Sequence, residues 1–229
     1  MKWLSRLMTP RSPQPGTKAR EVFKGIPYDA SLEPLGLAAF ATALEASGLI
    51  ADKWSECTGA ARPGSINWIV RSHELAYVLQ IVNRFTFAVG GDALRSRLQD
   101  YYTIRLVTSL VESSWQPSDS QKDSDPSFLT RMFNETLANV NSCEMKYAEF
   151  PKFLSKPQVI ERVDGNGVHL VPPEDDIAFG LSAMIAEDTS VELTPSLQEM
   201  IWGSNTTALS SSGLISHLTT TIDLAKRSN

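Results

Sequence analysis

Polar residues at helical spacing inside one long apolar stretch are the first candidates for chemistry in this sequence. His73, Gln80 and Arg84 are separated by seven and then four residues, so on a helix they lie along one line. This pattern favours a solvated helix face, because a surface helix carries one opposite its apolar side. The functional alternative is a groove lined by these residues that receives a partner or a small polar ligand, with Tyr101, Tyr102 and Arg105 beside them.

Three charged residues interrupt the apolar pattern of the same region. Arg71 and Glu74 project toward the apolar side of the first helix, and Arg105 lies between two apolar directions of the second. Charged groups inside an apolar arc need partners. The simpler interpretation is that each sits at an edge of the contact surface and extends its charged end into water. The alternative is a partly buried Arg–Glu network or an anion site.

The familiar catalytic and metal motifs fail on their spacing. The pair His73-Glu74 begins like a zinc-protease helix, but the second histidine would have to stand four residues later, where the chain has Tyr77. The other histidines, His169 and His217, are isolated, so a catalytic triad would require proximity that only the fold can supply. We therefore predict no metal and no cofactor, and we favour a protein that is not an enzyme.

The two cysteines, Cys57 and Cys143, are far apart and form no metal-ligand motif. Two thiols in a chain of this length make no disulfide framework, so a reducing cytoplasm is the expected location. Cys143 falls within an apolar helical pattern and is predicted to be a small core residue.

The charges divide the chain into a basic start and an acidic body. There are 21 Lys and Arg residues and 26 Asp and Glu residues, a net charge of −5. Residues 1–20 contain five basic residues and no acid, so the rest carries 16 − 26 = −10. An acidic body argues against nucleic-acid binding and suits a basic protein partner. Residues 1–20 are predicted to be a flexible arm, the one segment suited to weak membrane contact.

Residues 66–115 are predicted to form the centre of the fold. Trp68, Leu75, Val82 and Val89 fall on one line at the helical advance of about 100° per residue, which indicates a core-facing stripe. The pair Gly90-Gly91 ends this helix, and a second one follows. We expect the two to pack as an antiparallel hairpin.

The remaining elements follow from caps, turns and apolar periodicity. The predicted elements are a helix over residues 34–50 ending near Gly48, a loop over 55–65, an exposed loop over 116–124, a helix from Asp125-Pro126 to Tyr147, a β-hairpin over 158–171, a helix opened by Glu174-Asp175-Asp176, a short helix from Thr194-Pro195 to Gly203, a Ser/Thr-rich connector over 204–213, and a final helix. The hairpin turn Asp164-Gly165-Asn166-Gly167 resembles part of a calcium loop, but Arg162 and Pro173 would occupy ligand positions. Positive φ angles in a tight turn explain both glycines instead.

The sequence thus predicts a mainly α protein, a multi-helix bundle around a central helical hairpin, with residues 21–229 as one domain and a small β-hairpin inserted. The expected function is a non-enzymatic protein–protein interaction module with an acidic body, in which homo-oligomers are allowed. The alternative is a small-molecule-binding or hydrolytic domain with a polar pocket on the central hairpin. The binding candidates are Arg71, His73, Glu74, Gln80, Arg84, Tyr101 and Arg105.

Overall fold

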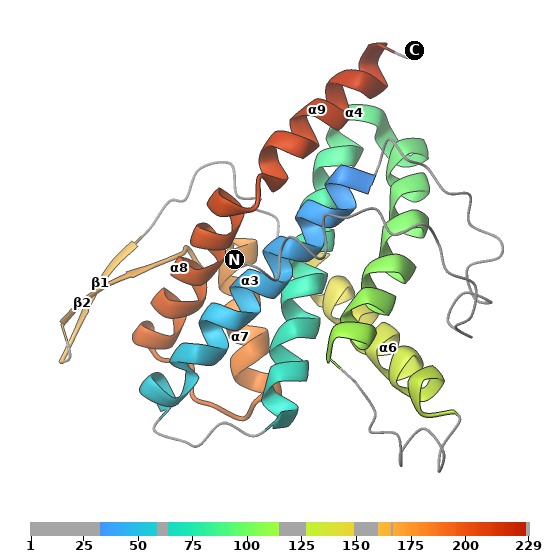
Figure 1. Cartoon of the computed structure of the whole chain (residues 1–229). Helices are drawn as coiled ribbons and strands as arrows, with labels where there is room; N and C mark the ends of the chain where they lie inside the picture. The colour runs from blue at the N-terminus through green and yellow to red at the C-terminus, as the bar shows by residue number, and fades with distance from the viewer. Residues whose placement is uncertain (1–32, 59–63, 115–126, 149–159, 166, 228–229) are drawn as a thin grey trace.

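A computed structural model describes residues 33–58, 64–114, 127–148, 160–165 and 167–227 of the chain. In these segments the protein is a bundle of helices with one two-stranded β-hairpin at its side (Figure 1). The predicted mainly α fold is confirmed. The predicted basic arm over 1–20, the exposed loop over 116–124 and the helix start at Asp125-Pro126 lie outside the described residues.

Helix α4 (Gly64–Ser114) occupies the centre and contacts α3, α6, α7 and α9. It is interrupted at Gly91, whose φ of 65° and ψ of −162° are accessible essentially only to glycine. Figure 1 shows the two halves of α4 running in opposite directions, so the predicted central hairpin is confirmed. The fully buried side chains of its first half include Leu75, Tyr77, Leu79 and Ile81.

Helices α3 (Glu33–Thr58) and α6 (Phe128–Ala148) pack against α4. The predicted end of α3 near Gly48 is wrong, and so is the start of the predicted loop at residue 55. Burial of Ile50 and Ala51 carries the helix onward to Thr58, and this outweighs the roughly 1 kcal/mol that a glycine costs inside a helix. One stretch of α3, Glu33–Lys53, is long and apolar enough to cross a membrane, and 61% of its most apolar window is buried within the bundle.

Helices α7 (Ile177–Asp188), α8 (Pro195–Ser211) and α9 (Leu214–Arg227) complete the bundle. The predicted cap at Thr194 is confirmed, because its side chain accepts a hydrogen bond from the backbone N–H of Leu197. The prediction that Glu174-Asp175-Asp176 open the preceding helix is wrong: α7 begins at Ile177, and Asp176 caps it by accepting from the backbone N–H of Ala178. The predicted connector over 204–213 is wrong, because α8 continues past Gly203 to Ser211.

Two features hold the end of α8 in a helix. The hydroxyl groups of Thr206, Thr207 and Ser210 each donate to the carbonyl oxygen four residues earlier, so their hydrogen bonds lie within the helix, and the hydroxyl group of Ser211 also reaches the carboxylate of Glu45 on α3 over 2.6 Å. The same segment also buries Ser204, Asn205 and Ala208. Composition alone suggested a polar loop, whereas packing of one face onto the core determines the helix.

Strands β1 (Ile160–Asp164) and β2 (Gly167–Val171) pair antiparallel within the predicted hairpin range. Gly167 has a φ of 134°, which explains one turn glycine; Gly165 is not among the glycines with positive φ, so that part of the turn prediction is wrong. Strand β2 packs on α8. The hairpin projects from the left of the bundle in Figure 1.

Candidate functional site

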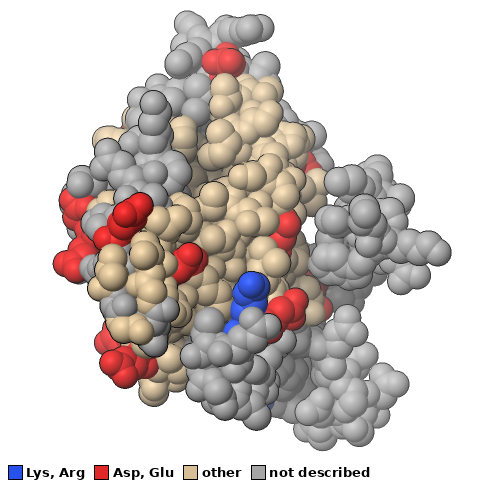
Figure 2. Space-filling view, turned by 90° about the vertical axis from the view of Figure 1, so that its left-hand side faces the viewer, with Lys and Arg blue, Asp and Glu red and all other residues tan. Residues whose placement is uncertain are grey.

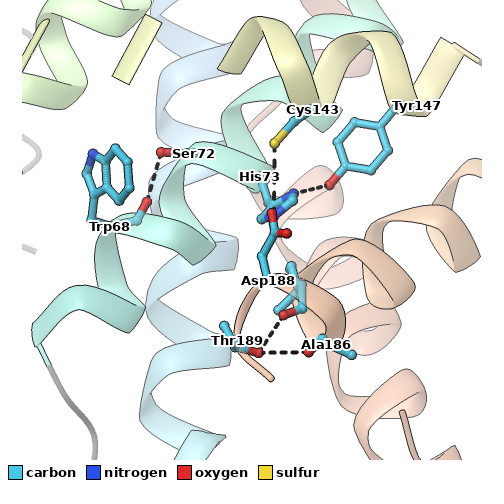
Figure 3. Close-up of polar contacts among 9 residues, drawn as sticks. Trp68, Ser72, His73, Cys143, Tyr147, Ala186, Asp188 and Thr189 are labelled. Carbon is cyan, nitrogen blue, oxygen red and sulfur yellow. Dashed lines mark hydrogen bonds and ion pairs between the residues drawn. The ribbon is translucent and has the colours of Figure 1, made fainter. Parts of the chain in front are cut away.

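The imidazole of His73 is fully buried where α4, α6 and α7 meet (Figure 3). Its Nδ1 lies 2.7 Å from the hydroxyl oxygen of Tyr147 on α6, and its Nε2 lies 2.8 Å from Oδ2 of Asp188, the last residue of α7. Tyr147 is buried, whereas one third of the Asp188 side chain is exposed. His73 therefore connects three helices that are remote in sequence.

The partners of His73 determine where its proton resides. Burial lowers the pKa of His73, although hydrogen bonding and the charge of Asp188 oppose this shift. A neutral imidazole has one donor and one acceptor nitrogen, and an ionised carboxylate can only accept. Nε2 therefore carries the proton and donates it to Asp188, and Nδ1 accepts the hydroxyl proton of Tyr147.

The sulfur of Cys143 on α6 lies 3.9 Å from the same nitrogen, Nε2 of His73. A nucleophilic triad uses the two nitrogens of the histidine for different partners, one for the nucleophile and one for the carboxylate. Here Cys143 and Asp188 share one nitrogen and Tyr147 occupies the other. Burial also raises the pKa of the Cys143 thiol to about 12, so it stays protonated at neutral pH. The arrangement is not that of a cysteine hydrolase.

The polar line on α4 is not a solvated face, so that prediction is wrong. His73 contacts Tyr147 as described, Gln80 donates to the carbonyl oxygen of Glu144, and Arg84 donates to that of Tyr147. All three partners lie on α6, which packs along this line. The carbonyl group of Tyr147 is among the last four of α6, which a helix end leaves without intrahelical donors, and Arg84 on α4 supplies a donor to it.

Glu74 is fully buried between α4 and α8, so the interpretation of an edge residue reaching water is wrong for it. Nδ2 of Asn205 donates to Oε1 of Glu74 over 3.1 Å. Burial raises the pKa of Glu74 to about 8, and the Asn205 hydrogen bond only partly offsets this. At neutral pH the carboxyl group is therefore mostly neutral.

Two other atoms of this pair bear on the protonation of Glu74. Among the described residues, Oε2 of Glu74 and Oδ1 of Asn205 are buried and have no hydrogen-bond partner. Both are acceptors when the carboxyl group is ionised. When Glu74 is protonated on Oε2, this oxygen becomes a hydrogen-bond donor. The amide oxygen Oδ1 of Asn205 remains an acceptor, so the pair then contains one donor and one acceptor instead of two acceptors.

A second buried carboxyl group lies on α6. Glu144 accepts from Nδ2 of Asn83 over 3.1 Å, and burial raises its pKa to about 7. Sequence reasoning missed Glu144 and Asn83, and it did not assign functions to Tyr147, Asp188 or Asn205. Their positions in helical patterns were visible, but partners 61 to 131 residues apart in sequence are brought together only by the fold.

The remaining candidate residues are Arg105, Arg71 and Tyr101. Arg105 donates to Glu33 at the start of α3 over 2.8 Å, and the two side chains are 35% and 38% exposed. The predicted edge position is therefore confirmed for Arg105, and its partner is not Glu74. Arg71 is half-buried. The side chain of Tyr101 lies outside the described part of the structure.

Replacing Arg105 with Leu should change the free energy of unfolding by no more than about 1 kcal/mol, because a half-exposed ion pair contributes little. Urea denaturation monitored by circular dichroism measures the change, with Glu33→Gln as the matched variant from the other side of the pair. A loss of several kcal/mol in either variant would contradict an edge position.

Comparison of the chain with protein-family models, curated protein sequences and solved structures finds no match.

Proposed function

We propose that this protein is a non-enzymatic interaction module that binds a basic, extended segment of a partner protein through its β-hairpin. The observation that carries the proposal is an exposed apolar face on the hairpin. In the strand register Val163 pairs with Val168, and Glu161 pairs with Leu170. Residues directly opposite each other share a face of the sheet. We call these four residues the outer hairpin face.

The opposite face of the hairpin anchors it to the bundle. His169 and Val171 alternate with the outer residues along β2 and are buried. His169 also lies 3.2 Å from the carboxylate of Glu199 on α8. The hairpin is therefore fixed by one face, while the outer hairpin face remains available for binding.

The outer hairpin face is unusually apolar for a surface. Val163 is 78% exposed, Val168 is 62% exposed and Leu170 is 37% exposed. Adjacent exposed apolar side chains on one element are typical of interaction sites, whereas single ones are common on any surface. An extended peptide that lies along a hairpin can place alternate side chains on such a face.

The surface around the hairpin is acidic, which favours a basic partner. Residues 160–212 contain nine Asp or Glu residues and one basic residue, Arg162, a net charge of 1 − 9 = −8. Glu161, Glu174, Asp175 and Glu187 are exposed. Figure 2 shows Asp and Glu side chains spread over the side of the bundle that carries the hairpin, with very little Lys or Arg. This surface attracts a basic segment and repels a second copy of itself.

The binding test uses a short fluorescent peptide of alternating valine and lysine, with a valine–glutamate peptide as the control probe. Replacing Val163 and Val168 together by Thr keeps the branched shape and strand propensity but adds hydroxyl groups. We expect this double variant to weaken binding of the basic peptide at least about tenfold, or about 1.4 kcal/mol, in fluorescence anisotropy.

The matched control is Met145→Thr, because Met145 is a 69% exposed apolar residue on α6, away from the hairpin. It should bind the basic peptide as the unmodified protein does. Equal binding by the Val163/Val168 double variant would overturn the proposal, as would equal affinity for the acidic peptide. If light scattering shows a dimer that the Val163/Val168 double variant does not form, the outer hairpin face is a self-association surface and the proposal is overturned.

The proposed setting is the cytoplasm, where reducing conditions keep Cys143 a free thiol, as it is in this structure.

A further inference from the structure

Three side chains around His73 offer a set of atoms that metal ions bind. Nε2 of His73, Sγ of Cys143 and a carboxylate oxygen of Asp188 all lie within 4.8 Å of one another. They come from α4, α6 and α7, and Figure 3 shows Cys143 and Asp188 both directed at the ring of His73. The set combines one nitrogen, one sulfur and one oxygen donor.

The spacing of these atoms is close to that of a tetrahedral zinc site. Zinc–ligand bonds of about 2.0 to 2.3 Å place neighbouring ligand atoms roughly 3.3 to 3.8 Å apart. The nitrogen–oxygen distance is 2.8 Å and the nitrogen–sulfur distance is 3.9 Å. The atoms therefore reach ligand positions through shifts of about 1 Å or less, which rotation of side chains such as that of Asp188 can supply.

The contacts around the donor atoms also suit a metal. A histidine that binds a metal through one nitrogen normally holds its other nitrogen in a hydrogen bond, which fixes the ring. Tyr147 occupies Nδ1 of His73 at 2.7 Å. The buried His73 and Cys143 form the protein side of the set, and Asp188, which is one third exposed, opens it to solvent.

We propose that His73, Cys143 and Asp188 bind a late divalent transition-metal ion, foremost Zn²⁺, with a solvent molecule as the fourth ligand. A thiolate and an imidazole favour zinc, cobalt, nickel or copper over magnesium and calcium, which prefer oxygen ligands. Three protein ligands and one open position form a coordination pattern common in zinc proteins. The spacing of the three residues, 70 and 45 positions along the chain, matches no sequence motif.

Binding has a defined proton balance. Cys143 binds as a thiolate, so its thiol proton is released to solvent. The proton on Nε2 of His73 must leave this nitrogen, and the neutral ring then carries its proton on Nδ1. Nδ1 becomes a donor to the hydroxyl oxygen of Tyr147, which can accept as well as donate. The metal thus releases one proton per ion and changes the tautomer of His73.

The metal would join three helices across long stretches of chain. Such a link stabilises the folded state because the ion binds it and not the unfolded chain. This inference does not depend on the hairpin, since none of the three proposed ligands lies on it. Loss of peptide binding by the hairpin variants and loss of metal binding by the variants below are separate results.

The test titrates metal-stripped full-length protein with Co²⁺ and then with Zn²⁺. We expect a single Co²⁺ ion per chain with a sulfur-to-cobalt charge-transfer absorption band that Zn²⁺ abolishes. Zinc at about a hundredfold excess over its dissociation constant should raise the melting temperature by about 5 to 10 °C, and Mg²⁺ should not. The ¹⁵N chemical shifts of His73 should report the change of tautomer.

Matched variants identify the ligands. Cys143→Ala should abolish the sulfur band, whereas Cys57→Ala should retain it. Asp188→Asn should weaken Co²⁺ binding at least about tenfold, and Glu187→Gln, at the neighbouring exposed position, should leave it unchanged. Asp188 is partly exposed, so this pair remains informative if Cys143→Ala unfolds. Absence of the band in the unmodified protein, or equal binding by Asp188→Asn, overturns the site.

Discussion

Replacing Glu74 with Gln should stabilise the protein at pH 7 by about 2 to 3 kcal/mol and remove part of the pH dependence of its stability. In the folded state Glu74 is fully buried, and its pKa is raised from 4.5 to about 8. In the unfolded chain it ionises freely at neutral pH, and this favours unfolding. Gln cannot ionise in either state, so the variant loses this penalty.

The sign of the pH effect follows from the direction of the shift. A folded pKa above the unfolded one means that the folded state holds the proton more tightly. The stability linked to Glu74 is therefore fully present below about pH 4.5 and is lost as the pH rises to about 8, by at most about 1.4 kcal/mol per pH unit. The two proteins should have similar stability near pH 4 and diverge as the pH increases.

Gln is also the substitution that fits the hydrogen bonds. Its oxygen can accept from Nδ2 of Asn205, as Oε1 of Glu74 does over 3.1 Å. Its amide nitrogen supplies a donor at the position of Oε2, which lacks a partner among the described residues. The change therefore removes the ionisable group and keeps the hydrogen bond from Asn205.

Urea denaturation at several pH values between 4 and 8.5 measures the effect. The matched control is Glu135→Gln on α6, because Glu135 is exposed and its replacement should leave the curve unchanged. Glu144, whose pKa is raised to about 7, contributes a similar dependence to both proteins, so the difference between them isolates Glu74. Parallel curves for the protein and Glu74→Gln would contradict a neutral, buried Glu74.

Replacing His73 with Leu should destabilise the protein by about 2 to 3 kcal/mol, measured with a chelator present so that bound metal plays no part. Leucine keeps most of the buried volume, so the main loss is polar. The hydroxyl group of Tyr147 is fully buried and loses the partner that it has at 2.7 Å. An unsatisfied buried hydroxyl costs about 1 to 3 kcal/mol, whereas Asp188 can turn to solvent.

A double variant separates this effect from general damage to the core. Adding Tyr147→Phe to His73→Leu removes the unsatisfied hydroxyl group, so the pair should be less destabilised than the sum of the single changes by about 1 kcal/mol or more. Gln80→Leu is the comparison on the same helix and should lose about 1 kcal/mol or less, because half-buried Gln80 makes one hydrogen bond. Additive losses would show that His73 and Tyr147 are not coupled.

The sequence predicted those elements whose signals are local. The apolar stripe of α4, its reversal at Gly90-Gly91, the cap at Thr194, and the β-hairpin all depend on residues within a few positions of one another. Caps and turns act through neighbouring backbone groups, and helical periodicity repeats within each turn. Such features can be predicted from a single chain without an alignment.

Two local signals failed where packing opposed them. Gly48 and the Ser/Thr-rich stretch after Gly203 both indicated helix ends, yet α3 and α8 continue. The reason is the burial of Ile50 in the first case and of Asn205 and Ala208 in the second. Burying such residues against other helices stabilises the helix by more free energy than the low helix propensity of one glycine, or of a few Ser and Thr residues, costs.

The polar centre was decided by tertiary structure alone. The line His73, Gln80 and Arg84 was visible in the sequence, but spacing on one helix cannot show whether water or another helix faces it. Here α6 packs against the polar line. Helix α6 supplies Tyr147 and Cys143 as neighbours of His73, and α7 supplies Asp188. The sequence by itself thus determined where helices form, apart from the ends of α3 and α8, and the polar line on one of them. The packing of α4, α6 and α7 determined that this line is buried, because only packing brings together side chains 70 to 115 residues apart.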